Sequence, residues 1–231
     1  MLYQDRTAAG QLLAGQLAHY ANRWGVLVLA LPQGGVPVAF EVAKALNAPL
    51  DVFVVRKLGV PGQEELAMGA IASGGVRVLN REIVQAHDSF EAAIYKATIR
   101  EQRELEQLER LYRNDRPFPD LYGRTVILVD DGLTTPANLR SAVIALRQQY
   151  PARIVVAMPI SSPETYHEIA ALADEMICAM TPRPFHSVEL WYKNNSQTID
   201  EEVRDLLQRA SDRYHPSTNS SQEASYSTQR S

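Results

Sequence analysis

Several features that would assign this chain to a particular class are missing from its sequence. It has a single cysteine, Cys178, so no internal disulfide can form, which is typical of proteins in a reducing compartment. No apolar run approaches the roughly 18 residues needed to span a bilayer, and the first residues lack the basic start and apolar stretch of a secretory signal. The formal net charge of −4 argues against broad binding to nucleic acids or membrane surfaces. These absences favour a cytoplasmic protein.

Common catalytic motifs are missing as well. The histidines are scattered without the spacing of metal ligands, and neither a Gly-x-Ser-x-Gly elbow nor a Walker A loop occurs. Cys178 lies between apolar neighbours in EMICAM, so we expect it in the core and not as a nucleophile. The sequence therefore disfavours a zinc enzyme, a serine hydrolase of the Gly-x-Ser-x-Gly type and a P-loop NTPase.

Short apolar runs alternate with amphipathic helical segments over most of the 231 residues. The length, with 45% hydrophobic and 22% charged residues, suits one α/β domain. Continuous apolar runs, typical of parallel strands covered on both faces, occur at 25–32, 48–57, 125–131 and 152–159, and helical patterns at 36–47 and 161–173. Strands separated by helices predict right-handed βαβ units and a doubly wound, mainly parallel sheet.

The pattern changes between the second and third of these strands. Residues 65–80 are typical of two short strands around a Ser-Gly-Gly turn, and 89–114 of a long helix whose apolar stripe includes Leu111. These elements predict a small hood within 58–114. Residues 212–231 are polar and serine-rich, which predicts a disordered tail and leaves 1–211 as the folded domain.

The stretch VILVDDGLTTPANLRSAV, residues 126–143, places two carboxylates directly after an apolar strand. Asp130 and Asp131 should lie at the carboxyl edge of the sheet, where open α/β folds bind ligands. A helix is expected to follow, with Thr135 as N-cap and Pro136 as first helical residue, and its start favours an anion. Carboxylates repel phosphate, so a ribose phosphate fits better: its hydroxyls can donate to the aspartates, which can also hold hydrated Mg²⁺.

VILVDDGLTTPANL resembles the phosphoribosyl-pyrophosphate (PRPP) motif of type I phosphoribosyltransferases, in which a strand, two acids and a Gly/Thr-rich turn follow one another. The segments LPQGGVPVAFEVAKALNAPLDVFVVRKLGVPGQEELAMGAIASGG and WYKNNSQTIDEEV are similar to a bacterial subgroup of that family. The resemblance extends from DRTAAGQ to DEEVRDLL. It implies the type I fold with its hood, and transfer of phosphoribosyl from Mg-bound PRPP to a small-molecule acceptor, usually a base nitrogen, with release of pyrophosphate. It names no acceptor, and dimers are common among such proteins.

The resemblance also implies roles for individual residues. Asp130 and Asp131 would hold the ribose hydroxyls, stabilise positive charge in the transition state and bind Mg²⁺ directly or through water. The 5′-phosphate would be wrapped by Gly132, Leu133, Thr134, Thr135, Pro136, Ala137, Asn138 and Leu139. Pyrophosphate would be bound by Gln33, Gly34 and Gly35 of the PQGG turn, and by Arg56 and Lys57 at the end of the second strand.

Three positions depart from the subgroup pattern: Gln33 replaces an arginine, Pro136 a glycine and Asn138 a threonine. Proline has no N–H, and a lost hydrogen bond to a charged group costs about 1.5–3 kcal/mol. If two such losses added, PRPP binding would weaken by roughly a hundredfold. A second function therefore stays open: a non-catalytic protein of this fold that binds a nucleotide or sugar phosphate for regulation. A phosphohydrolase is disfavoured because no Asp-x-Asp nucleophile lies near the amino terminus.

Two aromatic residues near the carboxyl-terminal helix, Trp191 and Tyr192, have two interpretations. Their rings could stack on an acceptor ring, or they could pack against the neighbouring helix. The sequence does not decide between these roles.

Overall fold

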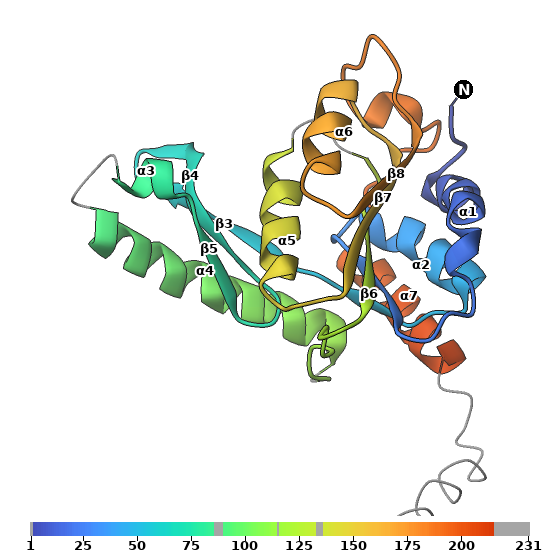
Figure 1. Cartoon of the computed structure of the whole chain (residues 1–231), viewed down its shortest axis with the longest axis horizontal. Coiled ribbons are helices and arrows are strands. Elements are labelled where there is room, and N and C mark those ends of the chain that lie inside the picture. The colour runs from blue at the N-terminus through green and yellow to red at the C-terminus, as the bar shows by residue number, and fades with distance from the viewer. Residues whose placement is uncertain (1, 86–89, 115, 133–135, 215–231) are drawn as a thin grey trace, which may run out of the picture.

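The computed structural model describes residues 2–85, 90–114, 116–132 and 136–214. A five-stranded parallel sheet has the order β2-β1-β6-β7-β8, and a three-stranded antiparallel sheet has the order β3-β4-β5 (Figure 1). The strands are β1 (Val26–Ala30), β2 (Leu50–Val52), β3 (Val55–Val60), β4 (Gln63–Ala72), β5 (Val76–Leu79), β6 (Thr125–Val129), β7 (Arg153–Ile160) and β8 (Glu175–Met180). The helices are α1 (Arg6–Gln16), η1 (Ala18–Tyr20), α2 (Gly35–Leu46), α3 (Arg81–Gln85), α4 (Phe90–Arg113), α5 (Ala137–Arg147), α6 (Pro163–Ala170), η2 (Glu189–Trp191) and α7 (Asp200–Tyr214).

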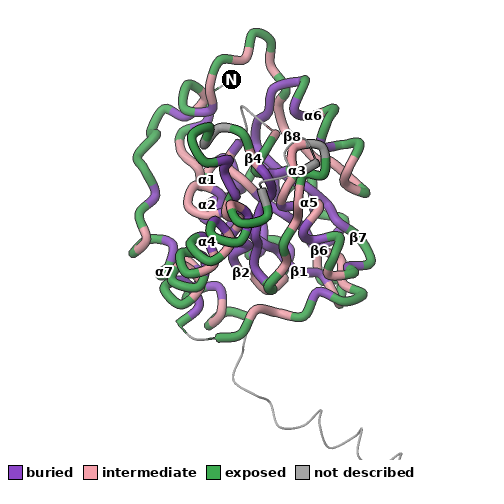
Figure 2. Tube along the Cα trace, turned by 90° about the vertical axis from the view of Figure 1, so that its left-hand side faces the viewer, coloured by how far each residue is buried: buried purple, intermediate pink, exposed green. Residues whose placement is uncertain are grey.

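The parallel sheet is covered on both faces, which confirms the predicted doubly wound arrangement. Alternate residues of β1 face opposite ways: Val26 and Val28 join the core beneath α1, α2 and α7, whereas Leu27 joins the core beneath α5 and α6. Figure 1 shows α5 and α6 on one side of the sheet and α1 and α2 on the other. In Figure 2 the strands of this sheet are mostly buried, while α4 and α7 carry exposed residues outside them. The continuous apolar runs of these strands reflect this double coverage.

The predicted second strand, 48–57, is in fact two strands in different sheets. Phe53 still donates its backbone N–H to Ala30 O of β1 at 2.8 Å, but the N–H of Val54 donates to Ser73 Oγ of the hood at 3.0 Å. The chain therefore leaves the parallel sheet between these two residues. Both residues are buried, so the apolar pattern continues across the change of sheet and hides it.

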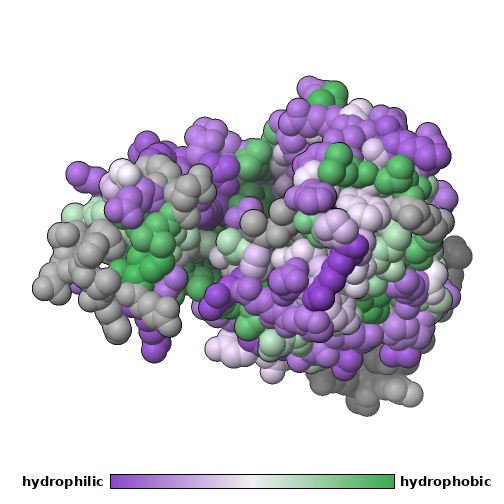
Figure 3. Space-filling view, turned by 90° about the horizontal axis from the view of Figure 1, so that it is seen from above, coloured by the Kyte–Doolittle hydropathy of each residue, from purple (hydrophilic) through white to green (hydrophobic). Residues whose placement is uncertain are grey.

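The hood consists of β3, β4, β5, α3 and α4, and it confirms the predicted pair of strands and the long helix. Gly74 and Gly75 form the predicted turn with φ of 82° and 74°, a backbone region that glycine adopts without strain. Seen from above in Figure 3, hydrophobic residues gather on the hood and along its junction with the main body, while hydrophilic residues dominate the rest of that face. Because β3 begins at Val55, the hood starts three residues before the predicted boundary at 58.

Two helices differ in detail from the sequence expectation. Leu111 of α4 is 37% exposed, and Tyr112 occupies the inward position instead. Helix α7 continues to Tyr214, so the first three residues of the expected tail 212–231 are helical; the others lie outside the described residues. Among the described residues, no helix has both the length and the apolarity that crossing a membrane requires.

Candidate functional site

The strand order reverses between β1 and β6, and this topology directs a ligand to the carboxyl ends of these two strands. Their register pairs Ala30 with Val129, and the backbone N–H of Leu31 donates to Val129 O at 2.9 Å. The turn that follows β1 therefore lies beside the acids that follow β6. The sequence predicted Asp130 and Asp131 at this edge of the sheet, and the structure places the PQGG turn beside them.

Two glycines allow the turn after β1 to approach the acid pair closely. A Cβ on Gly34 would overlap the Asp131 carboxylate, and one on Gly35 would lie 2.9 Å from Val129 O and 3.2 Å from Asp130 Oδ1. The backbone N–H of Gly35 already donates to Leu31 O at 3.1 Å. A pyrophosphate contact with the Gly35 N–H would therefore compete with this internal hydrogen bond. The close packing against Asp130 and Asp131 requires glycine at both positions.

The two carboxylates experience different electrostatic surroundings. Burial raises the pKa of Asp130 well above its ordinary value, and the neighbouring charge of Asp131 raises it further. Asp130 Oδ1 accepts a hydrogen bond from the backbone N–H of Asp131 at 2.9 Å. In the free protein, the proton on Asp130 therefore persists to higher pH than on an ordinary aspartate.

Asp131 is contacted by one residue of α1 and by one that follows η2. Arg6 Nε donates to Asp131 Oδ2 at 2.7 Å, and the Tyr192 hydroxyl donates to Asp131 O at 2.5 Å. Burial raises the pKa of Tyr192, and the negative charge of Asp131 adds to this, so the hydroxyl keeps its proton. Tyr192 is buried, which favours packing over the alternative of stacking on an acceptor.

The side chain of Gln33 is held by the amino-terminal end of α7. Gln33 Nε2 donates to Asp200 Oδ1 at 2.7 Å, and the Tyr112 hydroxyl donates to the same oxygen at 2.6 Å. These two hydrogen bonds lower the pKa of Asp200, that of Tyr112 having the larger effect. Gln33 lines the crevice, but its amide nitrogen is directed to Asp200 in this structure.

The expected pyrophosphate cations, Arg56 and Lys57, lie within β3 of the hood and not at the end of β2. Arg56 pairs with Glu101 of α4, with Nε and the terminal nitrogen 2.9 and 2.8 Å from Oε2. Arg100 donates to the other oxygen of Glu101 at 2.9 Å. Arg56 lines the cavity at the edge of the hood, whereas Lys57, the next residue along the strand, is exposed and does not line it.

The expected phosphate-binding turn is described in part. Leu133, Thr134 and Thr135 lie outside the described residues. Gly132 has φ of 147°, and a Cβ there would lie 2.7 Å from Ile160 Cγ2, so both conformation and space favour glycine. Helix α5 begins at Ala137, one residue later than expected, and the carbonyl of Pro136 accepts the first bond, from the Arg140 N–H at 2.8 Å. Asn138 is exposed in the first turn, whereas Leu139 is buried.

A cavity of about 390 Å³ joins these groups at the junction of the hood and the parallel sheet. That size is in the range of small-molecule sites. Its polar lining includes Gln33, Arg56, Tyr112, Asp130 and Asn138, and its apolar lining Leu31, Phe53, Val54, Val55 and Leu108. The cavity therefore offers an acid, a cation and amides within one half-apolar crevice.

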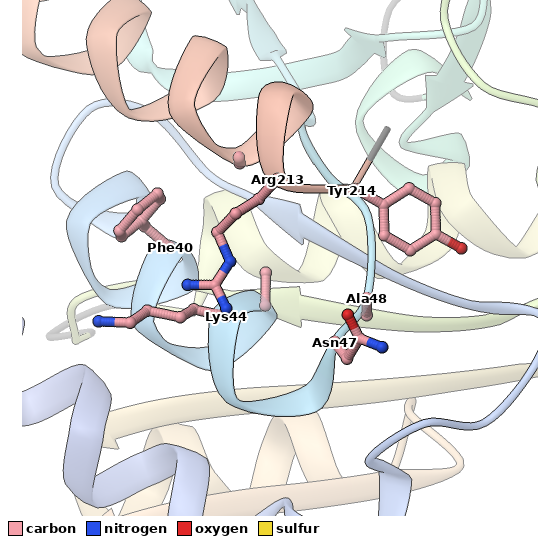
Figure 4. A pocket seen from close by; sticks show the side chains of 8 residues that line it. Phe40, Lys44, Asn47, Ala48, Arg213 and Tyr214 are labelled. Carbon is pink, nitrogen blue, oxygen red and sulfur yellow. The ribbon is translucent and has the colours of Figure 1, made fainter. Parts of the chain in front are cut away.

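A separate hollow lies between α2 and the end of α7, where the side chains of Lys44 and Arg213 approach each other near Phe40 (Figure 4). Its volume is about 20 Å³, which is room for a single water molecule. No carboxylate among the described residues lines this hollow. The crevice beside Asp130 is the candidate site because it lies at the carboxyl ends of β1 and β6 and is lined by Asp130.

The acid pair fits a magnesium ion only if the ligand supplies further oxygens. Nowhere in the described ranges do three or more His, Cys, Asp or Glu side chains gather as a metal cage. Mg²⁺ commonly keeps several waters and binds one or two carboxylates together with substrate oxygens, so the pair Asp130 and Asp131 is sufficient for that mode. Cys178 is no competing nucleophile, because burial raises the pKa of its thiol to about 11.

Sequence reasoning missed the residues that hold the site together: Arg6, Glu101, Tyr112 and Asp200. Three of their contacts join residues 45, 88 and 125 positions apart, which local patterns do not reveal. One local signal existed for Arg6. It follows the N-cap Asp5 as the first residue of α1, where a cation is unfavourable to the helix dipole and needs another explanation.

Comparisons with known proteins agree with this fold. The family model described as "Phosphoribosyl transferase domain" matches residues 3–188. A candidate phosphoribosyl transferase of Mycobacterium tuberculosis is 46% identical over 210 residues, which are 90% of this chain and 47% of the relative. The chain thus spans about half the length of the curated relatives it matches. The crystal structure of TT1426 from Thermus thermophilus superposes with a TM-score of 0.81 at 38% identity, covering 90% of this chain and 99% of that chain.

Proposed function

Because this chain belongs to the phosphoribosyl transferase domain family, we propose that it transfers a phosphoribosyl group from PRPP to a small-molecule acceptor and releases pyrophosphate. The observation that carries this proposal is the packing of the PQGG turn against Asp130 and Asp131 in one crevice. A sugar phosphate with a leaving group needs hydroxyl acceptors and anion donors side by side, and the crevice provides both. The acceptor is a nitrogen nucleophile of the nucleobase kind, and we draw this class from the family resemblance alone.

The acidic end of the crevice binds the sugar in this proposal. Asp130 and Asp131 accept hydrogen bonds from the ribose hydroxyls, and they lie near C1 as the bond to pyrophosphate breaks and the bond to the acceptor nitrogen forms. Positive charge develops on the sugar ring in that step, and fixed negative groups stabilise it. A ligand hydroxyl or cation also favours the ionised form of Asp130, whose pKa is raised in the free protein.

The opposite end binds the leaving group. Arg56 presents a guanidinium to the cavity, and Gly34 of the PQGG turn offers its backbone N–H. Mg²⁺ bound with the ligand would neutralise charge on the departing pyrophosphate, held by the two aspartates and by the oxygens of PRPP. The residues Gly132 to Leu139 then surround the 5′-phosphate.

Calorimetric titration with PRPP and Mg²⁺ tests the proposal, with Asp131→Asn as the variant that removes the charge at the sugar. We expect the wild type to bind at sub-millimolar concentrations and Asp131→Asn to bind at least about tenfold more weakly. Asp205→Asn is the matched control, because Asp205 is an exposed aspartate of α7 paired with Arg209 on the same helix. Absence of wild-type binding up to millimolar PRPP would contradict the proposal.

A second function has one observation in its favour. Pro136 is the N-cap of the helix after the phosphate turn and has no N–H to donate, which reduces the anion-binding capacity that turnover of PRPP requires. The chain would then bind a nucleotide or sugar phosphate without transferring it. A screen of pyrophosphate release against a panel of nucleobases separates the two functions: PRPP binding without release from any acceptor favours the regulatory one.

A further inference from the structure

Arg6 is a cation inside an acidic site, and no feature of its own helix explains it. It is the first residue of α1, where a positive charge is unfavourable to the helix dipole. The first turn of that helix contains no acidic residue that could pair with it. Its side chain is only 15% exposed and that of Asp131 only 16%, and Nε lies 2.7 Å from Asp131 Oδ2. An ion pair this far removed from solvent is screened less than a surface pair.

Several contacts hold the guanidinium of Arg6 in one orientation. Its terminal nitrogens donate to Ser196 O at 2.9 Å and to Asn195 Oδ1 at 3.3 Å, and its Cζ lies 5.3 Å from the centre of the Tyr192 ring. A guanidinium held in a fork of this kind is pre-organised. Arg6 is therefore bound by two residues of the 195–196 segment as well as by Asp131 and Tyr192.

The backbone beneath Arg6 is fixed as well. Asp5 caps α1 by accepting a hydrogen bond from the Ala8 N–H at 2.8 Å. The segment before it pairs with the segment after η2: Tyr3 N–H donates to Trp191 O at 2.9 Å, and Lys193 N–H donates to Tyr3 O at 2.9 Å. The amino-terminal segment and the segment around Trp191 and Lys193 thus form one unit that presents Arg6 to the site.

Asp131 is constrained at three points by this unit and by the turn after β1. Arg6 holds its carboxylate, Tyr192 holds its backbone carbonyl at 2.5 Å, and Gly34 lies so close that no larger side chain fits beside the carboxylate. Only Oδ2 is paired with Arg6. The carboxylate therefore has a fixed orientation.

From these contacts we propose that Arg6 is a positioning residue for Asp131. It fixes the orientation in which the carboxylate receives a ribose hydroxyl, and its charge offsets one of two adjacent acids so that a polyphosphate can bind beside them. This rests on the proposed function, to which it adds an electrostatic requirement: two carboxylates alone would repel PRPP. The contrary reading is that Arg6 blocks the site by occupying the oxygen that the sugar needs.

Removal of the charge at position 6 separates these readings. We expect Arg6→Gln to weaken PRPP binding by about tenfold or more, and Arg6→Lys, which restores the charge without the fork, to recover most of that loss. The matched control is Arg23→Gln, because Arg23 also lies over a tyrosine ring, that of Tyr20 at 5.5 Å, but outside the crevice. Binding by Arg6→Gln that equals or exceeds the wild type would overturn the proposal, and so would failure of Arg6→Lys to exceed Arg6→Gln.

A double-mutant cycle in thermal unfolding tests the same contact without any ligand. Arg6→Gln should lower the melting temperature by more in the wild-type background than in the Asp131→Asn background, because the contacts of Arg6 with Ser196, Asn195 and Tyr192 are lost in both but the ion pair only in the first. An equal loss in both backgrounds would show that Arg6 does not act on Asp131 and would overturn the proposal. Coupling in the cycle combined with no wild-type affinity for PRPP would instead reject the proposed function and leave the positioning of Asp131 supported.

Discussion

The two ends of the crevice are built in different ways. At the acidic end, Asp130 and Asp131 follow a central strand of the parallel sheet, and the backbone of that sheet fixes their place. At the cationic end, Arg56 and Gln33 are held by side chains of other elements, namely Glu101 of α4 and Asp200 of α7. The acidic end is therefore part of the sheet scaffold, whereas the cationic end depends on how the hood and α7 pack against it.

This difference decided what could be predicted from the sequence. The acid pair was found because a strand, its end and the following turn are adjacent in the chain, and β1 and β6 were found by their apolar runs. The partners of Arg56 and Gln33 lie 45 and 167 residues away, beyond any local pattern. The change of sheet at Phe53 was missed for a related reason, since burial is uniform there and only tertiary pairing marks the break.

A larger side chain at Gly34 should disrupt the acidic end, because it would occupy the space beside the Asp131 carboxylate. Gly34→Ala should reduce PRPP binding by about a hundredfold or more, because the new methyl group displaces the Asp131 carboxylate and separates it from Arg6. Gly15→Ala in α1 is the matched control, since nothing lies within 4 Å of a Cβ there and a helix gains about 0.5–1 kcal/mol from the change. Titration and thermal unfolding measure both effects. Unchanged binding in Gly34→Ala would mean that Asp131 has no role in the site.

Removal of the Arg56 charge should weaken anion binding at the cationic end. Arg56→Gln should weaken the binding of inorganic pyrophosphate by about tenfold, because the crevice loses its guanidinium. Arg100→Gln is the matched control: Arg100 contacts the same Glu101 but does not line the cavity. Equal loss of pyrophosphate affinity in both variants would indicate that the effect comes from an unpaired Glu101 and not from a contact between Arg56 and the ligand.

The pH dependence of stability distinguishes Asp130 from an ordinary surface acid. Its pKa in the folded state is raised, so the folded protein binds more protons than the unfolded chain above the ordinary value of about 3.9, and the free energy of unfolding falls as pH rises through the raised value. Asp130→Asn removes this penalty. It should raise the melting temperature at pH 7 and have no such effect below about pH 4. Scans of thermal unfolding from pH 4 to 8 measure this, and a destabilised variant at pH 7 would contradict the burial effect.

The smallest effect is expected where the sequence suggested a large one. Gln33 replaces an arginine of the subgroup, but its amide is directed to Asp200, which also receives the Tyr112 hydroxyl. An arginine at position 33 would meet the same carboxylate and form an ion pair with it, so its charge would be neutralised within the protein. We therefore expect Gln33→Arg to change PRPP affinity by less than about threefold, and to tighten it further only in an Asp200→Asn background, where no carboxylate competes. Strong tightening by Gln33→Arg alone, measured by titration, would show that Asp200 releases the side chain when ligand binds, and that the cationic end adapts to its ligand while the acidic end stays fixed.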